Sequence, residues 1–331
     1  MWRQRYENQL LTIDTGTTNT RISLIKGETL CDTLKVKVGV GDTKKKPGLL
    51  QATIKEGIST ILSRNNLSAE NVEGILACGM ITSELGLCKL EPLKTPCGIE
   101  ELARELRPIT IPEISPLPFF FIRGVMMQGN DFETTDIMRG EETELIGLTD
   151  HIEPNCLYIL PGSHSKRIQT DSKGRIASFC TELTGELMSA IADGTILSQT
   201  IDLSIDVEID NEYLKMGYHY AREHGLTAAF FKVRILQNMF GCTKPQLYGF
   251  FKGVALCPEI ENIRKTGIQS IVVAGKAQLR NPMYTILQDF SDRNISAVPD
   301  AVSDHATAMG MIKIFRFAKE LHSNRRQADT P

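Results

Sequence analysis

The amino-acid sequence predicts an α/β protein with two domains, each made of a mixed sheet and helices. Its 331 residues are many for a single hydrophobic core, so a split into two domains is expected. Residues 10–40 alternate like an antiparallel strand meander and lead into a helical segment and a buried strand. A similar order of strands and helices starts again near residue 150, with little residue identity between the two copies. We therefore predict one domain at 1–150 and a second at 151–331.

Composition and charge exclude several classes of partner. Hydrophobic residues make up 41% of the chain and charged residues 23%, which is typical of a soluble globular protein. The formal net charge of −3 gives no overall basic field for nucleic acid or for an anionic membrane. No run of about 18 apolar residues could form a membrane span, and residues 1–9 lack the apolar core of a signal peptide. We expect a cytoplasmic protein with neither nucleic-acid nor membrane partners.

Cysteine and histidine spacing argues against a structural metal. The eight cysteines include no C-x-x-C pair, and the six histidines include no H-E-x-x-H motif. The cysteines lie mostly in apolar surroundings, as reduced core residues do. We expect neither a disulfide framework nor a structural transition metal.

The first candidate binding element is a predicted β-hairpin at residues 10–24. An apolar strand, a turn of glycine and small polar residues, and a second β-branched strand follow one another there. This hairpin could bind phosphate oxygens through backbone N–H groups, hydroxyls and a guanidinium. These groups belong to Gly16, Thr17, Thr18, Asn19 and Arg21. Asp14 would repel bare phosphate, so at the mouth of the hairpin it indicates a Mg²⁺ ion held mostly through water. An ordinary polar turn explains the same residue types equally well.

The remaining elements of the first half follow from periodicity and from glycine and proline. Residues 48–64 have helical spacing, and 72–78 form a buried strand that ends at a loop with Gly79, Met80 and Ser83. Strand-end loops bind ligands in α/β sheets, so this loop is a candidate ligand pocket, and packing against the proline-rich segment is the alternative. Segment 87–118 is predicted as irregular cover with a short helix at 99–106. A strand at 119–125 follows, and Gly140 precedes a helix with two leading glutamates.

The second half begins with predicted strands at 156–160, 166–170 and 174–179, the first two joined by a turn at 161–165. Helices are expected at 184–196, 211–225, 228–240 and 246–256. A buried strand at 270–274 delivers a glycine, a helix is predicted to begin at Pro282, and a short strand is expected at 297–299. The last helix is expected to begin near Asp304, and residues 323–331 are predicted to be disordered.

Three turns, in this order, resemble the actin-like ATPase fold of sugar kinases, actin and Hsp70. The hairpin at 13–21 resembles the first phosphate motif, Pro161-Gly162-Ser163-His164 the second, and Val272-Val273-Ala274-Gly275 the adenosine motif. The blocks at 138–147, 161–166 and 184–187 are similar to the 2-dehydro-3-deoxygalactonokinase family. The loop at 79–83 also fits this family, which implies that Gly79, Met80 and Ser83 line a sugar-acid pocket. Thr15 departs from that family, which often carries Trp at this place. The resemblance spans roughly residues 10–315 and implies two actin-like ATPase (ribonuclease H-like) domains facing a nucleotide cleft.

The resemblance also implies a reaction and its reagents. Members of this family phosphorylate 2-dehydro-3-deoxy-D-galactonate at its 6-hydroxyl, so Mg²⁺ and ATP are expected here. Nucleotide and phosphate contacts in the second half are then expected from Gly162, Ser163, His164, Lys166, Gly275 and Lys276. His164 is expected to fix its loop rather than to act as a base, and a solvated side chain explains Lys166 equally well.

A carboxylate is needed to take the proton of the attacking hydroxyl. Glu141 follows a glycine at the head of a helix, where related sugar kinases place their base, so we assign this role to Glu141. Glu142 is the alternative, because consecutive helical positions point about 100° apart and only one can face the ligand. The alternative for both glutamates is that they only stabilise the first helical turn and have no role in catalysis. Arg139 is the candidate for the substrate carboxylate, with an internal salt bridge to Asp136 or either glutamate as its alternative.

Two other functions are kept as alternatives. One is a kinase of the same fold for another sugar or sugar acid. The other is a non-enzymatic nucleotide-switch or sensor protein, against which the lack of a long interaction insert argues. The expected partners are ATP and a small sugar acid, and a homodimer is left open.

Overall fold

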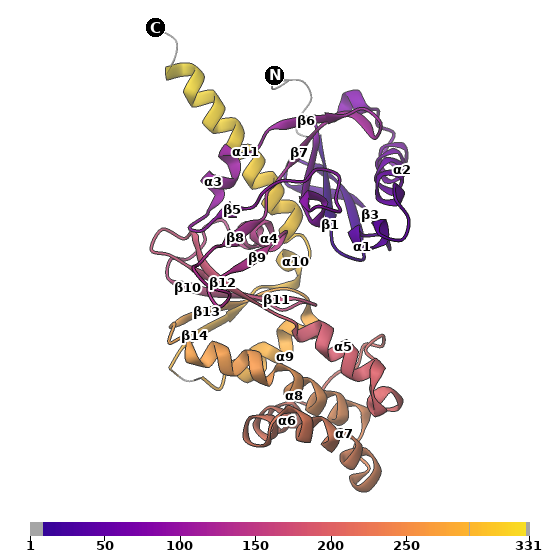
Figure 1. Ribbon diagram of the computed structural model, residues 1–331, viewed down its shortest axis with the longest axis vertical. Helices are drawn as coiled ribbons and strands as arrows, with labels where there is room; N and C mark the ends of the chain where they lie inside the picture. The colour runs from indigo at the N-terminus through magenta and orange to yellow at the C-terminus, as the bar shows by residue number, and fades with distance from the viewer. Residues whose placement is uncertain (1–8, 291, 329–331) are drawn as a thin grey trace. The chain divides into compact units, whose positions relative to one another are not determined.

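The computed structural model describes residues 9–290 and 292–328, and Figure 1 shows its helices and strands. By compactness the chain divides into two units. Unit 1 holds the residues up to Ile152, the segment Asp171–Ser178 and the residues from His305 on, and unit 2 holds Glu153–Thr170 and Phe179–Asp304. Both units combine a sheet with helices, which confirms the predicted α/β class. The sequence-based division placed the C-terminal helix in the second half, whereas this helix packs within unit 1.

Unit 1 is built on a six-stranded sheet with the order β3-β2-β1-β4-β7-β6. Its strands are β1 (Gln9–Thr15), β2 (Thr20–Lys26), β3 (Thr29–Val36), β4 (Ile75–Gly79), β6 (Pro108–Ile111) and β7 (Ser115–Phe121). A three-stranded sheet holds β5 (Leu93–Lys94), β8 (Val125–Met127) and β9 (Asp136–Met138). The helices are α1 (Val40–Thr43), α2 (Leu49–Arg64), α3 (Ile99–Arg104), α4 (Glu141–Leu148) and α11 (Ala306–Ala328), with 3-10 turns η1 (Ala69–Asn71) and η2 (Met80–Thr82).

The two faces of the six-stranded sheet bury alternate residues of each strand. Leu11 and Ile13 of β1 point into the core that α2 closes with its own apolar side, including Ile54. On the opposite face Phe120 of β7 meets Phe315 of α11, with ring centroids 5.0 Å apart in an edge-to-face arrangement. The alternation therefore places Asp14 on the face that α11 covers.

Helix α4 lies very close to α11. A Cβ on Gly147 would lie 1.7 Å from the carbonyl oxygen of Ala306, and a Cβ on Gly310 would lie 1.9 Å from that of Thr143. Neither glycine can carry a side chain unless one of the helices moves. This contact fixes α4, whose N-terminal turn carries the two candidate bases.

The prediction of irregular cover at 87–118 is wrong for part of that segment. Strands β6 and β7 both lie largely within it, and β7 is an interior strand between β4 and β6. Proline lacks only its N–H, so a strand tolerates it wherever the ladder needs no donor. Strand β7 pairs with β4 from Phe119 onwards, which leaves Pro116 and Pro118 outside that ladder.

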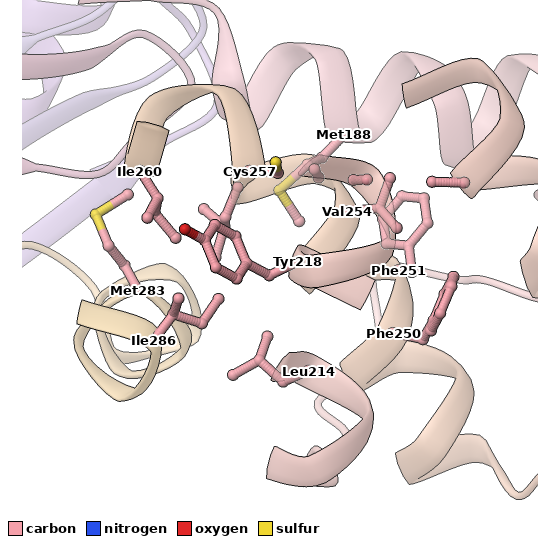
Figure 2. Packing of buried hydrophobic residues seen from close by; sticks show 14 of the residues in the cluster. Met188, Leu214, Tyr218, Phe250, Phe251, Val254, Cys257, Ile260, Met283 and Ile286 are labelled. Carbon is pink, nitrogen blue, oxygen red and sulfur yellow. The ribbon is translucent and has the colours of Figure 1, made fainter. Parts of the chain in front are cut away.

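Unit 2 has a five-stranded sheet with the order β12-β11-β10-β13-β14. The strands are β10 (Cys156–Leu160), β11 (Ser165–Thr170), β12 (Ile176–Glu182), β13 (Ser270–Val273) and β14 (Asn294–Ala297). The helices are α5 (Thr184–Gly194), α6 (Asn211–His224), α7 (Leu226–Phe240), α8 (Lys244–Lys265), α9 (Ala277–Leu287) and α10 (Asp300–Ser303), with the 3-10 turn η3 (Ile196–Gln199). Figure 2 shows the centre of its core, where Tyr218 of α6, Ile260 of α8 and Met283 of α9 meet.

The two sheets repeat one arrangement. Strand β1 pairs antiparallel with β2 and parallel with β4, and β10 pairs antiparallel with β11 and parallel with β13. The repeat predicted from element order is therefore present although the residues differ. No described helix is both long and apolar enough to span a membrane.

Helix α9 begins at Ala277, five residues before the predicted start at Pro282. Proline is common in the first helical turn, but Pro282 lies inside the helix. Proline cannot donate to the carbonyl four residues back, which is that of Gln278. The Nζ of Lys252 in α8 donates to this oxygen instead, at 3.1 Å, and so replaces the missing helical bond.

Other element boundaries also differ from the prediction. Strand β14 covers Asn294–Ala297 rather than 297–299, and α8 begins two residues earlier and ends nine residues later than predicted. Helix α11 continues to Ala328, so the expectation of disorder from residue 323 is wrong for the described part. Residues 329–331 lie outside the described residues.

Candidate active site

Three chain segments converge in unit 1 at the ends of β1 and β4 and at the start of α4. A Cβ on Gly79 would lie 2.5 Å from the carbonyl oxygen of Thr15 and 3.4 Å from Oδ1 of Asp14. A Cβ on Gly140 would lie 3.4 Å from the Cα of Gly79. The φ angles of Gly79 and Gly140 are +83° and +114°, which side chains rarely adopt. The two glycines thus bring the Asp14 carboxylate close to the N-terminus of α4.

Glu142 is turned into the protein. Its side chain is fully buried, and both carboxylate oxygens accept from the backbone N–H of Gly140, at 3.0 and 2.8 Å. The hydroxyl of Thr143 donates to the same carboxylate at 2.9 Å. Burial, and then the charge of Glu141, raise the pKa of Glu142 to about 8, although its hydrogen bonds work in the opposite direction. Glu142 therefore stabilises the turn before α4, and its carboxylate is not accessible to a substrate hydroxyl.

Glu141 differs from its neighbour in exposure. It is the first residue of α4 and is only partly buried, and its Oε2 accepts from the backbone N–H of Arg139 at 3.1 Å. The amino end of a helix favours a negative charge. Of the two leading glutamates, Glu141 is the one whose carboxylate a ligand could reach.

Acidic groups gather around the thiol of Cys78. Asp14 of β1 lies directly opposite Arg21 of β2 on one side and Cys78 of β4 on the other. Burial raises the pKa of Cys78 well above its usual value, and the charges of Asp14, Glu142 and Glu141 raise it further. Asp14 and Glu141 therefore bring acidic groups close together in this corner of unit 1, and a bound cation would relieve their repulsion.

A magnesium ion with few protein ligands fits this corner. Among the described residues there is no group of three or more His, Cys, Asp or Glu that could hold a metal ion. Mg²⁺ commonly keeps several waters and is bound by one or two carboxylates together with substrate phosphates. Asp14 meets that requirement, because it is a single, partly exposed carboxylate at the mouth of the hairpin.

The turn of the first hairpin is braced from behind by α1. The backbone N–H of Val40 donates to the carbonyl of Gly16 at 3.1 Å, and that of Gly41 donates to the carbonyl of Thr17 at 2.9 Å. A Cβ on Gly39 would lie 2.3 Å from the same Thr17 oxygen, so this approach requires glycine. The tip itself is exposed at Thr17, Thr18 and Asn19, and the Asn19 amide donates to the Thr18 hydroxyl at 2.8 Å.

The candidate substrate residues are partly engaged within the protein. Nη1 of Arg139 donates to the carbonyl oxygens of Thr82 and Leu90, at 3.1 and 3.2 Å, so the guanidinium ties the start of α4 to the loop after β4. The hydroxyl of Ser83 donates to the carbonyl of Met80 at 2.7 Å, and Met80 packs against the α2 side of the core. Through these bonds Nη1 of Arg139 serves as a loop anchor.

The second candidate phosphate turn lies in unit 2, between β10 and β11. Gly162 and Ser163 offer their carbonyls to the backbone N–H groups of Gly185 and Glu186, each at 3.1 Å. A Cβ on Gly185 would lie 2.4 Å from the Gly162 oxygen, so the start of α5 touches the turn directly. A Cβ on Gly162 would meet nothing within 4 Å, which leaves open space on its outer side. The turn can therefore approach a bulky anion closely.

The remaining predicted residues of unit 2 surround this turn. His164 pairs with Glu186 of α5 at 2.9 Å, and the Nζ of Lys166 donates to the His164 carbonyl at 3.1 Å. Lys166 is buried, so a solvated lysine does not describe it. Gly275, with a φ of +80°, would carry a Cβ 3.0 Å from the carbonyl of Pro161 at the start of the turn. Lys276 is exposed at the N-cap of α9.

Sequence reasoning missed two supports of these turns. Gly39 with Val40 and Gly41 backs the first turn, and the buried Glu259 of α8 lies behind the second. The glycine pair of the first support was visible as a loop, but its contact with residue 17 is a tertiary feature. Nothing in the sequence marks Glu259, because its partner Thr184 is 75 residues away.

The chain is similar to several known proteins. A "Probable 2-dehydro-3-deoxygalactonokinase" of Rhizobium meliloti (strain 1021) is 30% identical over 267 residues, which cover 78% of this chain and 83% of that protein. A 2-dehydro-3-deoxygalactonokinase of Escherichia coli (strain K12) is 24% identical over 259 residues, covering 77% and 80%. A crystal structure from Sinorhizobium meliloti, described as that of a proposed 2-dehydro-3-deoxygalactonokinase, superposes with a TM-score of 0.74 at 24% identity and covers 93% and 98%. This last likeness confirms the predicted fold.

The family model described as 2-keto-3-deoxy-galactonokinase matches residues 14–314, from the candidate magnesium ligand to the middle of α11. The match thus includes every candidate residue of both turns, the start of α4 and the loop after β4. The chain belongs to the 2-keto-3-deoxy-galactonokinase family.

Proposed function

We propose that this protein transfers the γ-phosphoryl group of ATP to the 6-hydroxyl of 2-dehydro-3-deoxy-D-galactonate. The observation that carries the proposal is the partly exposed carboxylate of Glu141 at the N-terminus of α4, with the Asp14 carboxylate close to that helix end. Family membership supports the reaction class and the sugar acid. ATP and the sugar acid are its small-molecule partners, and the cytoplasm is where we place the reaction.

In the proposed mechanism, Glu141 accepts the proton of the 6-hydroxyl while that oxygen attacks the γ-phosphorus in line. The new O–P bond forms as the bond from the γ-phosphorus to the bridging oxygen of ADP breaks, and ADP leaves with the electron pair. Glu142 keeps the turn before α4 in place through the Gly140 N–H. Positioning and charge stabilisation supply most of the rate enhancement in such reactions.

The phosphate groups need compensation for their charge. Asp14 would hold Mg²⁺, mostly through water, and the ion would neutralise phosphate oxygens. The backbone and hydroxyl groups of the first turn and the turn at 162–165 would donate to the phosphates, and Arg21, opposite Asp14, adds a positive charge. Gly275 would leave room for adenosine beside the second turn.

The test compares ADP release by the wild type, Glu141→Gln and Glu142→Gln with Mg-ATP and a panel of sugar acids. The panel contains 2-dehydro-3-deoxy-D-galactonate, its gluconate epimer and plain hexoses, with a control that lacks any sugar. We expect release only with the galactonate acid, and a kcat about 10²–10⁴-fold lower for Glu141→Gln. Glu142→Gln should keep most of the turnover.

Two results would contradict this proposal. Steady ADP release without any sugar acid would favour a nucleotide switch. Loss of turnover in Glu142→Gln but not in Glu141→Gln would exchange the roles of the two glutamates. Binding of ATP, measured directly for each variant, separates a loss of chemistry from a loss of nucleotide.

A further inference from the structure

Glu259 of α8 is a buried carboxyl that the proposed reaction does not use. Its side chain is 1% exposed, and its neighbours Cys257 and Ile260 belong to the core that Figure 2 shows. Its Oε1 has no hydrogen-bond partner among the described residues. A buried carboxyl with an unpaired oxygen is costly, so its presence calls for an explanation.

One oxygen of this carboxyl holds the start of α5. The hydroxyl of Thr184 donates to Oε2 of Glu259 at 2.6 Å. Thr184 is the first residue of α5, and the next two residues donate their backbone N–H groups to the carbonyls of Gly162 and Ser163. Glu259 thus acts on the first half of the turn through the end of a helix.

Ser165, the first residue of β11, stands at the other end of the turn. Its hydroxyl oxygen accepts from the backbone N–H of Gly162 at 3.3 Å. This hydroxyl also lowers the pKa of Glu259, so it lies near the same buried carboxyl. The carboxyl of Glu259 is therefore bonded to the start of α5 and lies close to the second half of the turn.

We propose that Glu259 is a positioning residue, which holds the turn at 162–165 in the shape that receives the phosphate groups of ATP. The identity of the ligand rests on the proposed function. The role of Glu259 rests on the hydrogen bond from the Thr184 hydroxyl, on the backbone bonds between α5 and the turn, and on its burial beside the core around α8.

The charge of Glu259 should respond to a bound phosphate. The pKa of Glu259 is raised to about 7, chiefly by burial. The charge of Glu182 of β12 also raises this pKa, whereas the hydroxyls of Thr184 and Ser165 and the charge of Arg167 lower it. Arg167 is itself paired with Glu182, at 2.9 Å. Added negative charge at the turn favours the neutral carboxyl, so ATP affinity should fall as the pH rises through this range.

The experiment uses the full chain in three variants. Glu259→Leu removes the acceptors, Glu259→Gln keeps an acceptor without a charge, and Glu261→Gln is the control on the same helix. Glu261 contacts Tyr218 of α6 and not the turn. The readouts are kcat, KM for ATP, KM for the sugar acid, and hydrogen exchange of the backbone N–H groups of residues 185 and 186.

We expect Glu259→Leu to raise KM for ATP by about tenfold or more, because the variant loses the hydrogen bond between Thr184 and the carboxyl. The kcat and the KM for the sugar acid should change far less. The exchange of both amides should become faster. Glu259→Gln should restore KM for ATP to within about twofold and remove the difference between pH 6 and pH 8. The control should match the wild type.

An unchanged KM for ATP and unchanged amide exchange in a folded Glu259→Leu would overturn the proposal. Should Glu259→Leu not fold, Thr184→Val takes its place. A higher KM for ATP with faster amide exchange in that variant would support the proposal, and no change in either would overturn it. Direct titration of the wild type with ATP in the absence of sugar acid separates this inference from the proposed function. ATP binding without phosphorylation of any sugar acid would contradict the proposed reaction. The ATP affinities of the Glu259 variants would then still decide the role of Glu259.

Discussion

Neutralising Glu142 should stabilise the protein, and the gain should grow with pH. The pKa of Glu142 rises from 4.5 in the unfolded chain to about 8 in the folded protein, chiefly through burial. Between these two values the folded state binds more protons than the unfolded state, so the free energy of unfolding falls as the pH rises. Above pH 8 the folded protein bears the whole cost of a buried carboxylate.

The size of the effect follows from the two pKa values. Taken with about 1.4 kcal/mol per pKa unit, they give a cost to folding of about 1 kcal/mol at pH 5, about 3 at pH 7 and about 5 at pH 9. Glu142→Gln removes this cost and keeps an acceptor for the Gly140 N–H. It weakens the hydrogen bonds of the turn by about 1 kcal/mol. The variant should therefore match the wild type at pH 5 and exceed it by several kcal/mol at pH 9.

Urea unfolding of the wild type and of Glu142→Gln at pH 5, 7 and 9 measures this difference. Glu56→Gln on the exposed side of α2 is the control, because it changes the same functional group without burial. A stability difference between Glu142→Gln and the wild type that does not change with pH would refute the reasoning. So would a variant that is less stable than the wild type at pH 9.

Two other substitutions test the packing described above. Gly79→Ala should lower the free energy of unfolding by about 2–4 kcal/mol, because the new Cβ would lie 2.5 Å from the Thr15 carbonyl oxygen and the residue has a φ of +83°. Thermal unfolding measures this effect. An unchanged Tm would contradict the close approach of Gly79 to Thr15. Lys252→Met should cost about 1–3 kcal/mol by leaving the Gln278 carbonyl unpaired. In a Pro282→Ala background that carbonyl regains a helical N–H, so chemical unfolding should give a smaller cost there; equal costs in both backgrounds would contradict the explanation.

The turns and helix starts were predictable because their signals are local. Residues 10–24 carry period-two alternation and turn residues, and the structure has strands β1 and β2 there. The glycine before Glu141 marked the start of α4 to the residue. Local pattern also gave the order of elements in unit 2, although the residues of the two sheets share little identity.

The rest depended on contacts distant in sequence. Strand β7 was not predicted because it contains prolines, and the sequence pattern does not tell which strand positions need no hydrogen-bond donor. The start of α9 was misplaced because Lys252, in another helix, satisfies the carbonyl that Pro282 leaves unpaired. Two adjacent glutamates could not be told apart from sequence, and only burial separates them. Which residues bind each ligand stays a prediction.

The place of α11 in unit 1 has a consequence for the order of folding during synthesis. All residues of unit 2 are synthesised before α11, and domains generally fold as units as they emerge from the ribosome. Until α11 has emerged, Phe120 lacks Phe315, and α4 lacks the glycine of α11 on which it packs. The nascent chain should therefore complete unit 2 before unit 1, and the turn that carries both glutamates should reach its final form only after α11 has emerged.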